Sequence, residues 1–199
     1  MVGRSNVGKS SLINALVRQR VARTSAAPGK TRLANVYRVA RGGGAPLYLL
    51  DLPGYGYARA AKGTRGPRSP EAARRASQHE FEAIVRAVFA RQPAGLLLVD
   101  ARHPGLETDR AAWQWIREAA GKASVVATKI DKLGRGERIR ALRSFESVLE
   151  TSVLPVSAVT GEGLEELWKL IDRLANSSKP EPLRSRRPPK ATAPLAPRK

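Results

Sequence analysis

The chain has 199 residues, of which 42% are hydrophobic, which suits one domain with a packed core and excludes wholesale disorder. Cysteine is absent and the apolar runs are too short to span a bilayer, so we exclude disulfides and thiolate metal sites and expect a cytoplasmic protein that binds no membrane. The formal charge of +19 favours a polyanionic partner, with nucleic acid first, unless arginine is simply over-used.

Short apolar runs alternate with helical patterns along the chain. This order is typical of an α/β fold with a mixed, mostly parallel sheet and helices on both faces. In chain order, the patterns predict strands at 33–39, 47–50, 96–99, 125–127 and 153–156, and helices at 10–19, 81–89, 107–120, 136–150 and 164–171. Trp113 and Trp115 are two residues apart, so both cannot lie at the centre of one helix face.

Three segments carry no strand or helix pattern. Segments 20–32 and 53–70 are rich in Gly, Pro and Arg, and loops this long are usually functional. Segment 177–199 combines prolines with basic residues and cannot support a core. We therefore expect one domain at 1–176 and a basic, proline-rich, disordered tail at 177–199.

The first motif lies at the start of the chain, where Gly3-Arg4-Ser5-Asn6-Val7-Gly8-Lys9-Ser10 matches the pattern G-x-x-x-x-G-K-[ST]. Backbone N–H groups of such a loop wrap a phosphate, and the helix that follows adds its positive end. Lys9 is expected to reach the β- and γ-phosphates, and the Ser10 hydroxyl to ligate Mg²⁺. An ordinary glycine-rich turn is the alternative.

A second motif, Asp51-Leu52-Pro53-Gly54, ends an apolar strand. In nucleotidases with a phosphate loop, an acid at this place holds Mg²⁺ through water, and the glycine N–H meets the γ-phosphate. Taken alone, this tetrapeptide is also a common exit from a strand into a turn.

A third motif, Thr128-Lys129-Ile130-Asp131, follows another strand. A carboxylate can accept hydrogen bonds from both N1–H and the amino group of guanine, whereas adenine offers no such donor pair. Asp131 would therefore select GTP over ATP, with the stem of Lys129 packed along the base, unless the motif is a surface turn. Val156, Ser157 and Ala158 are a weaker candidate for a backbone N–H that contacts the guanine O6.

These motifs together resemble a specific group. The run from Gly3 to Asn14, the segments Thr24-Ser25 and Pro28-Gly29-Lys30-Thr31, and the runs 51–58, 100–104 and 128–133 look like the EngB (YihA/YsxC) family of bacterial GTP-binding proteins, within the TrmE–Era–EngA–EngB–septin-like group. The resemblance covers about residues 1–175.

The resemblance implies a Ras-like GTPase fold with a phosphate loop, GTP or GDP with Mg²⁺, and a role in assembly of the large ribosomal subunit, linked to growth, cell division and septation. It also implies that Thr31 ligates Mg²⁺ in the GTP state. The resemblance adds Ser11, Pro28, Gly29 and Lys30 to the expected nucleotide-binding residues. We expect segment 20–32 to become ordered when GTP binds, and we expect a monomer.

The residues also bear on the rate of hydrolysis. A Ras-type enzyme has a glutamine after Asp-x-x-Gly to orient water, but Tyr55 stands there, so we expect slow intrinsic turnover. In related GTPases an asparagine at the position of Asn6 helps to coordinate K⁺; local capping of the loop is the alternative. We expect no catalytic role for His79 or His103.

The phosphate loop starts at Gly3, so the central strand that should precede it is missing from this sequence. We therefore expect that the domain at 1–176 is truncated at its N-terminus. A basic RNA-binding module with a degenerate, non-hydrolysing nucleotide site is the alternative function. A third hypothesis is a G domain joined to an RNA-modifying domain, but this chain is too short to carry the second domain.

Overall fold

The computed structural model describes residues 1–22, 34–40, 45–55 and 87–176. Residues 81–86 of the expected helix at 81–89 lie outside the described residues, and residues 87–89 are helical as expected. Also outside the described residues are the tail at 177–199, His79, most of the loop at 53–70, and residues 23–32 of segment 20–32, with Pro28, Gly29, Lys30 and Thr31.

Four parallel strands form the main sheet, in the order β1-β4-β5-β6. They are β1 (Val2–Gly3), β4 (Ala94–Asp100), β5 (Lys122–Thr128) and β6 (Val153–Pro155). Strands β2 (Asn35–Val39) and β3 (Leu47–Asp51) form an antiparallel ribbon. The strands expected from short apolar runs are therefore present, with shifts of a few residues at their ends.

The first strand corrects one expectation. Val2 and Gly3 pair in parallel with Leu97 and Leu98 of β4, so two residues of the central strand are present where the sequence predicted none. The backbone beside them joins the ribbon, since the Met1 amino group donates to the Leu50 oxygen at 2.6 Å and the Leu52 N–H donates to the Met1 oxygen at 3.2 Å. β1 thus lies between β3 and β4.

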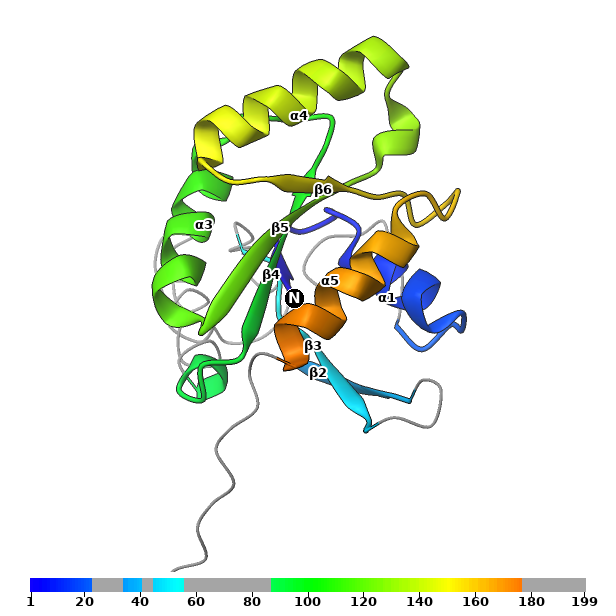
Figure 1. Cartoon of the computed structure of the whole chain (residues 1–199), viewed down its shortest axis with the longest axis vertical. Coiled ribbons are helices and arrows are strands. Elements are labelled where there is room, and N and C mark those ends of the chain that lie inside the picture. Colours follow the sequence, from blue (N-terminus) through cyan, green and yellow to red (C-terminus); the bar gives the residue numbers. More distant parts are fainter. Residues whose placement is uncertain (23–33, 41–44, 56–86, 177–199) are drawn as a thin grey trace, which may run out of the picture.

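Helices cover both faces of the sheet (Figure 1). Helices α1 (Lys9–Val17) and α5 (Leu164–Asn176) pack on one face, and α3 (Glu107–Ala119) and α4 (Arg135–Leu149) pack on the other. Consecutive side chains of β4 serve alternate cores: Leu96 and Leu98 join the cluster under α1 and α5, and Leu97 and Val99 join that under α3 and α4. This confirms the predicted α/β architecture.

The two tryptophans of α3 differ as their spacing predicts. Trp113 is 6% exposed, and its indole N–H donates to the Leu149 carbonyl at the end of α4. Trp115 is half-buried and packs edge to face against Phe89, with ring centroids 4.9 Å apart. Among the described helices, none is long and apolar enough to cross a bilayer.

Candidate functional site

The predicted phosphate loop runs from the end of β1 into α1. Gly3 has no room for a side chain, because a Cβ there would lie 2.8 Å from the Leu98 carbonyl oxygen. Gly8 has φ of 103° and Asn6 has φ of 63°, which are left-handed values that Gly and Asn tolerate best. The sequence therefore provides permissive residues where the chain turns back to start α1.

Lys9 and Ser10 open α1 at the base of this loop. Lys9 is 8% exposed, and its ammonium group donates to the Gly3 and Arg4 carbonyl oxygens at 3.2 and 3.4 Å. Burial lowers the pKa of Lys9, and the nearby Asp51 carboxylate partly opposes that shift. Lys9 thus places a cation inside the loop, with Ser11 exposed on the first turn of α1.

Asp51 ends β3 and is 1% exposed. Burial raises its pKa, against the attraction of Lys9 and the terminal amino group. Its Oδ1 atom makes no hydrogen bond to the described residues. A buried carboxylate with an unpartnered oxygen, close to Lys9 and the adjacent Ser10, fits a divalent cation that also takes hydroxyl, water and phosphate oxygens.

Gly54 lies directly against the phosphate loop. A Cβ at Gly54 would lie 2.8 Å from the Ser5 nitrogen, and a bridge pairs Arg4 with Tyr55. Leu52 and Pro53, which precede Gly54, are both buried. The structure therefore brings the first two motifs together.

The third motif joins the same edge of the sheet. The Thr128 hydroxyl lies 2.6 Å from the Val7 carbonyl oxygen and 3.0 Å from that of Val99. Lys129, with φ of 62°, donates to the Asn6 carbonyl and to Asp100 Oδ2. Two side chains of this motif thus fasten it to the phosphate loop.

Asp131 lies in a 3₁₀ turn (Ile130–Lys132) and is fixed by Ser157 after β6, whose hydroxyl donates to Oδ1 at 2.7 Å. Burial opposes ionisation of Asp131, but this hydrogen bond and the Lys132 ammonium hold its pKa below the ordinary value. The carboxylate is therefore ionised and oriented. Val156 and Ser157 are fully buried, and Ala158 is half-buried beside them.

Sequence reasoning assigned no role to Asp100, which ends β4 as Asp51 ends β3. Its carboxylate accepts two hydrogen bonds from the Arg102 guanidinium, at 2.9 and 2.7 Å, and one from Lys129 at 2.9 Å. Burial opposes ionisation, but these bonds hold the pKa of Asp100 well below its usual range. The position of Asp100 in the sequence could have indicated a role, since an acid at the carboxyl end of a parallel strand faces the edge of the sheet where ligands bind.

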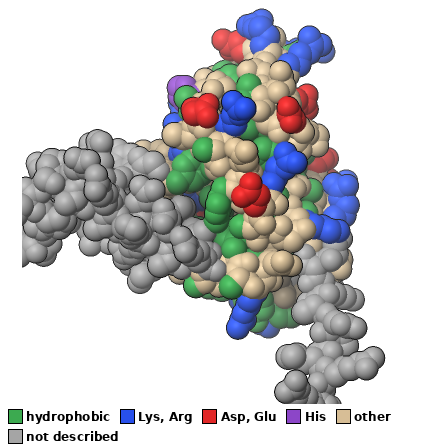
Figure 2. Space-filling view, turned by 90° about the vertical axis from the view of Figure 1, so that its left-hand side faces the viewer, with side chains coloured by type: hydrophobic (Ala, Val, Ile, Leu, Met, Phe, Trp, Pro, Cys, Tyr) green, Lys and Arg blue, Asp and Glu red, His purple; other side chains and the backbone are tan. Residues whose placement is uncertain are grey.

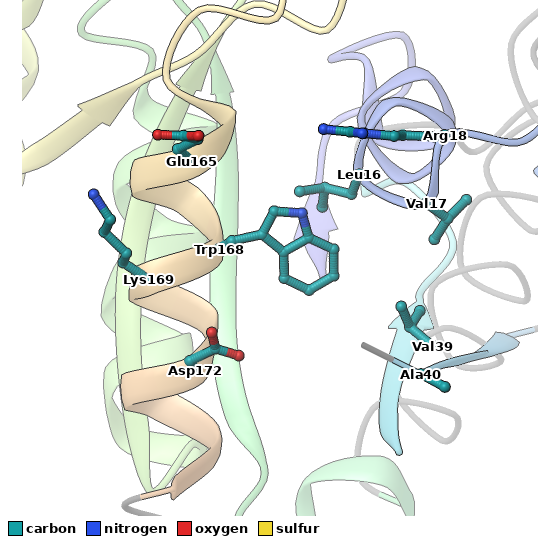
Figure 3. A pocket seen from close by; sticks show the side chains of 9 residues that line it. All are labelled: Leu16, Val17, Arg18, Val39, Ala40, Glu165, Trp168, Lys169 and Asp172. Carbon is teal, nitrogen blue, oxygen red and sulfur yellow. The ribbon is translucent and has the colours of Figure 1, made fainter. Parts of the chain in front are cut away.

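A pocket of about 550 Å³ lies away from this edge, between the end of α1, β2 and α5 (Figure 3). The Trp168 ring points into it, and its rim carries two cations and two carboxylates. None of the predicted site residues lines it; the lining residues are Leu16, Val17, Arg18, Val39, Ala40, Glu165, Trp168, Lys169 and Asp172. Because the rim charges balance, they favour neither an anion nor a cation.

A glycine-rich phosphate loop, a strand-end aspartate and an oriented carboxylate on one edge of an α/β sheet define a GTPase with a phosphate loop. Residues 1–129 match the family described as 50S ribosome-binding GTPase. The chain belongs to the EngB family of GTP-binding proteins: it is 40% identical to the probable GTP-binding protein EngB of Lachnospira eligens, over 85% of this chain and 76% of that protein. It is 38% identical to that of Heliobacterium modesticaldum, over 91% and 84%.

Solved structures agree with the fold. Era in complex with MgGDPNP and a segment of 16S ribosomal RNA is 26% identical, with a TM-score of 0.69, over 98% of this chain and 57% of that one. A probable GTP-binding protein EngB superposes with a TM-score of 0.62 at 22% identity, over 88% of this chain and 97% of that one. These similarities confirm the Ras-like GTPase fold.

Proposed function

We propose that this GTPase binds GTP and GDP with Mg²⁺ at the edge described above, hydrolyses GTP slowly, and acts as a switch in assembly of the large ribosomal subunit in the cytoplasm. Through that role it would support growth, cell division and septation. The observation that carries the proposal is the joining of the three motifs: Lys129 and Thr128 contact the phosphate loop, and Gly54 contacts it at Ser5.

The proposed nucleotide-binding residues divide between the two ends of the ligand. The loop amides from Arg4 to Ser10 and the Lys9 ammonium would hold the β- and γ-phosphates, with the Gly54 N–H beside the γ-phosphate. Mg²⁺, when bound, would neutralise phosphate charge, held by the Ser10 and Thr31 hydroxyls and, through water, by Asp51. At the other end, Asp131 would accept from guanine, and the 156–158 segment would contact O6.

Slow hydrolysis is supported by the contact that Tyr55 makes. Its hydroxyl donates to Asp109 of α3 at 2.9 Å, and burial raises its pKa, so it remains a neutral donor committed to α3. A phenol in that position cannot accept a proton from water as a free base would. Hydrolysis would then depend on backbone groups, on a partner, or on a monovalent cation near Asn6.

The ribosomal part of the proposal is supported by the family description, by the relation to Era, which was crystallised with ribosomal RNA, and by the charge of +19. Era reaches that RNA in a chain longer than this one, so RNA contact by the present residues needs its own test. We propose that the protein acts as a monomer on precursors of the large subunit.

Titration of the full chain with fluorescent mant-GTP tests the nucleotide site. We expect micromolar, Mg²⁺-dependent binding that excess ATP does not compete away, and Asp131→Asn should lose most of that affinity because the paired acceptor is gone. Sedimentation with large-subunit precursors should show association that differs between GTP-analogue and GDP states. Association without nucleotide binding would instead favour an RNA-binding module with a degenerate site.

Hydrolysis in K⁺ and in Na⁺ buffers tests the monovalent cation. We expect faster turnover in K⁺, lost in Asn6→Gly, which keeps the left-handed φ without strain but removes the side chain. Equal rates in both buffers would exclude a K⁺ role for Asn6.

A further inference from the structure

Asp109 lies in the first turn of α3, far in sequence from the three motifs, yet its side chain reaches two of them. It is 1% exposed. Its Oδ1 atom accepts the Tyr55 hydroxyl at 2.9 Å and lies 3.3 Å from Arg4 Nε. A single carboxylate oxygen is thus shared by the phosphate loop and by the residue that follows Gly54.

These two contacts lie next to the place where the loop and the Asp51–Gly54 segment meet. Arg4 is between Gly3 and Ser5, and its backbone is bridged to that of Tyr55. One residue further along the first segment and one residue earlier in the second, the approach is so close that a Cβ added to Gly54 would lie 2.8 Å from the Ser5 nitrogen. Asp109 therefore contacts the neighbours in sequence of both residues that approach each other here, Ser5 and Gly54.

The contacts of Asp109 with Arg4 and Tyr55 are not of a kind that stabilises the fold. Burial raises the pKa of Asp109, and its Oδ2 and the Arg4 Nε make no hydrogen bond to the described residues. A buried ion pair with unsatisfied atoms contributes little or costs stability. Glu107, in the same helical turn, is exposed and shows that an acid there need not be buried to favour the helix start.

We infer that Asp109 is a positioning residue for GTP hydrolysis, which holds Ser5 and Gly54 at the spacing that the γ-phosphate requires. The inference rests on the proposed function. Asp109 does not touch the nucleotide; it acts through Arg4 and Tyr55. Phosphoryl transfer depends on placement, and a shift of about 1 Å can cost up to about a hundredfold in rate.

Single-turnover hydrolysis and GDP affinity of the full chain test this, in Asp109→Asn, Tyr55→Phe and the exposed control Glu107→Gln. Asp109→Asn keeps an acceptor for Tyr55 but loses the charge facing Arg4, and we expect its hydrolysis rate to fall about tenfold. Its affinity for GDP should stay within about twofold, because GDP has no γ-phosphate and Asp131 is untouched. Tyr55→Phe keeps the ion pair and should lose less, and Glu107→Gln should match the wild type.

The outcomes separate the two claims. No hydrolysis by the wild type overturns the proposed function and this inference with it. Wild-type hydrolysis with unchanged rates in both Asp109→Asn and Tyr55→Phe overturns the inference alone. Equal losses of rate and GDP affinity also overturn it, since that is the effect of a structural residue. If Asp109→Asn does not fold, the same criteria apply to Tyr55→Phe.

Discussion

At the scale of single residues, three aspartates at or just after strand ends have different electrostatic settings. Asp100 is paired with Arg102 and Lys129, and Asp131 is oriented by Ser157. Asp51 has one oxygen without a partner among the described residues. A buried carboxylate without a hydrogen-bond partner lowers the stability of the protein, and such a group serves ligand binding.

Asp51→Asn should therefore stabilise the protein without nucleotide. Because burial raises the folded-state pKa of Asp51, folding favours its protonated form, and this contribution is present below the ordinary pKa of about 4 and lost as pH rises through the raised value. At neutral pH the ionised group costs stability, so the variant should melt a few degrees higher, while the two proteins should converge near pH 4 and below.

Thermal unfolding across pH, with and without Mg²⁺ and GDP, measures this effect. The variant should also lose the stabilisation that Mg²⁺ adds to the GDP complex. Glu118→Gln, at an exposed position on α3, is the matched control and should change neither quantity. A lower melting temperature for Asp51→Asn at neutral pH would contradict the interpretation of Asp51.

At the scale of elements, the contact between α3 and α4 depends on one directional bond. The Trp113 indole donates to the Leu149 carbonyl, one of the last carbonyls of α4. Trp113→Phe keeps an aromatic ring but leaves that buried acceptor without its donor, at a cost of about 1–3 kcal/mol. Trp115→Phe, which removes no such bond among the described contacts, should cost less.

Urea unfolding of both variants checks this prediction. Both substitutions remove the same atoms from the same helix, but Trp113 is buried and Trp115 is half-buried, so the difference combines the hydrogen bond with the deeper burial of Trp113. Equal free energies of unfolding for the two variants would contradict a contribution from the bond to Leu149.

The elements also show how far sequence patterns reach. Short apolar runs and helical periodicity were sufficient for the strands β3 to β6 and for helices α1, α3, α4 and α5, because these elements bury apolar side chains in the core. Glycine spacing predicted the phosphate loop. The pattern could not reveal that Asp109 contacts Arg4 and Tyr55, since an acid in the first turn of a helix is ordinary and the contact depends on how α3 packs against β4 and β5.

At the scale of the whole molecule, the positive charge is unevenly placed along the chain. The described residues hold 18 of the 36 basic residues but 13 of the 17 acidic ones. Most of the excess therefore belongs to segments 23–33, 41–44, 56–86 and 177–199. The face shown in Figure 2 agrees, since its basic and acidic side chains are interspersed.

The proposed binding to ribosomal RNA should therefore weaken steeply with salt, and the tail should contribute to the slope. Replacing Arg184, Arg186 and Arg187 with Gln removes three tail cations and should reduce the slope of log affinity against log salt by about 2 to 3. The same change at Arg135, Arg140 and Arg143 on α4 should have less effect, because glutamates share that helix. Affinity measured from low to high KCl tests this; equal slopes for both variants would contradict it.

The bonds from Thr128 and Lys129 to the phosphate loop have a consequence for discrimination among nucleotides. A base that fits badly beside Asp131 would push on the same short segment whose side chains grip the carbonyls of Val7 and Asn6. The mismatch would then also weaken binding of the triphosphate at the far end of the ligand. An incorrect nucleotide would therefore lose affinity at both its base and its phosphates.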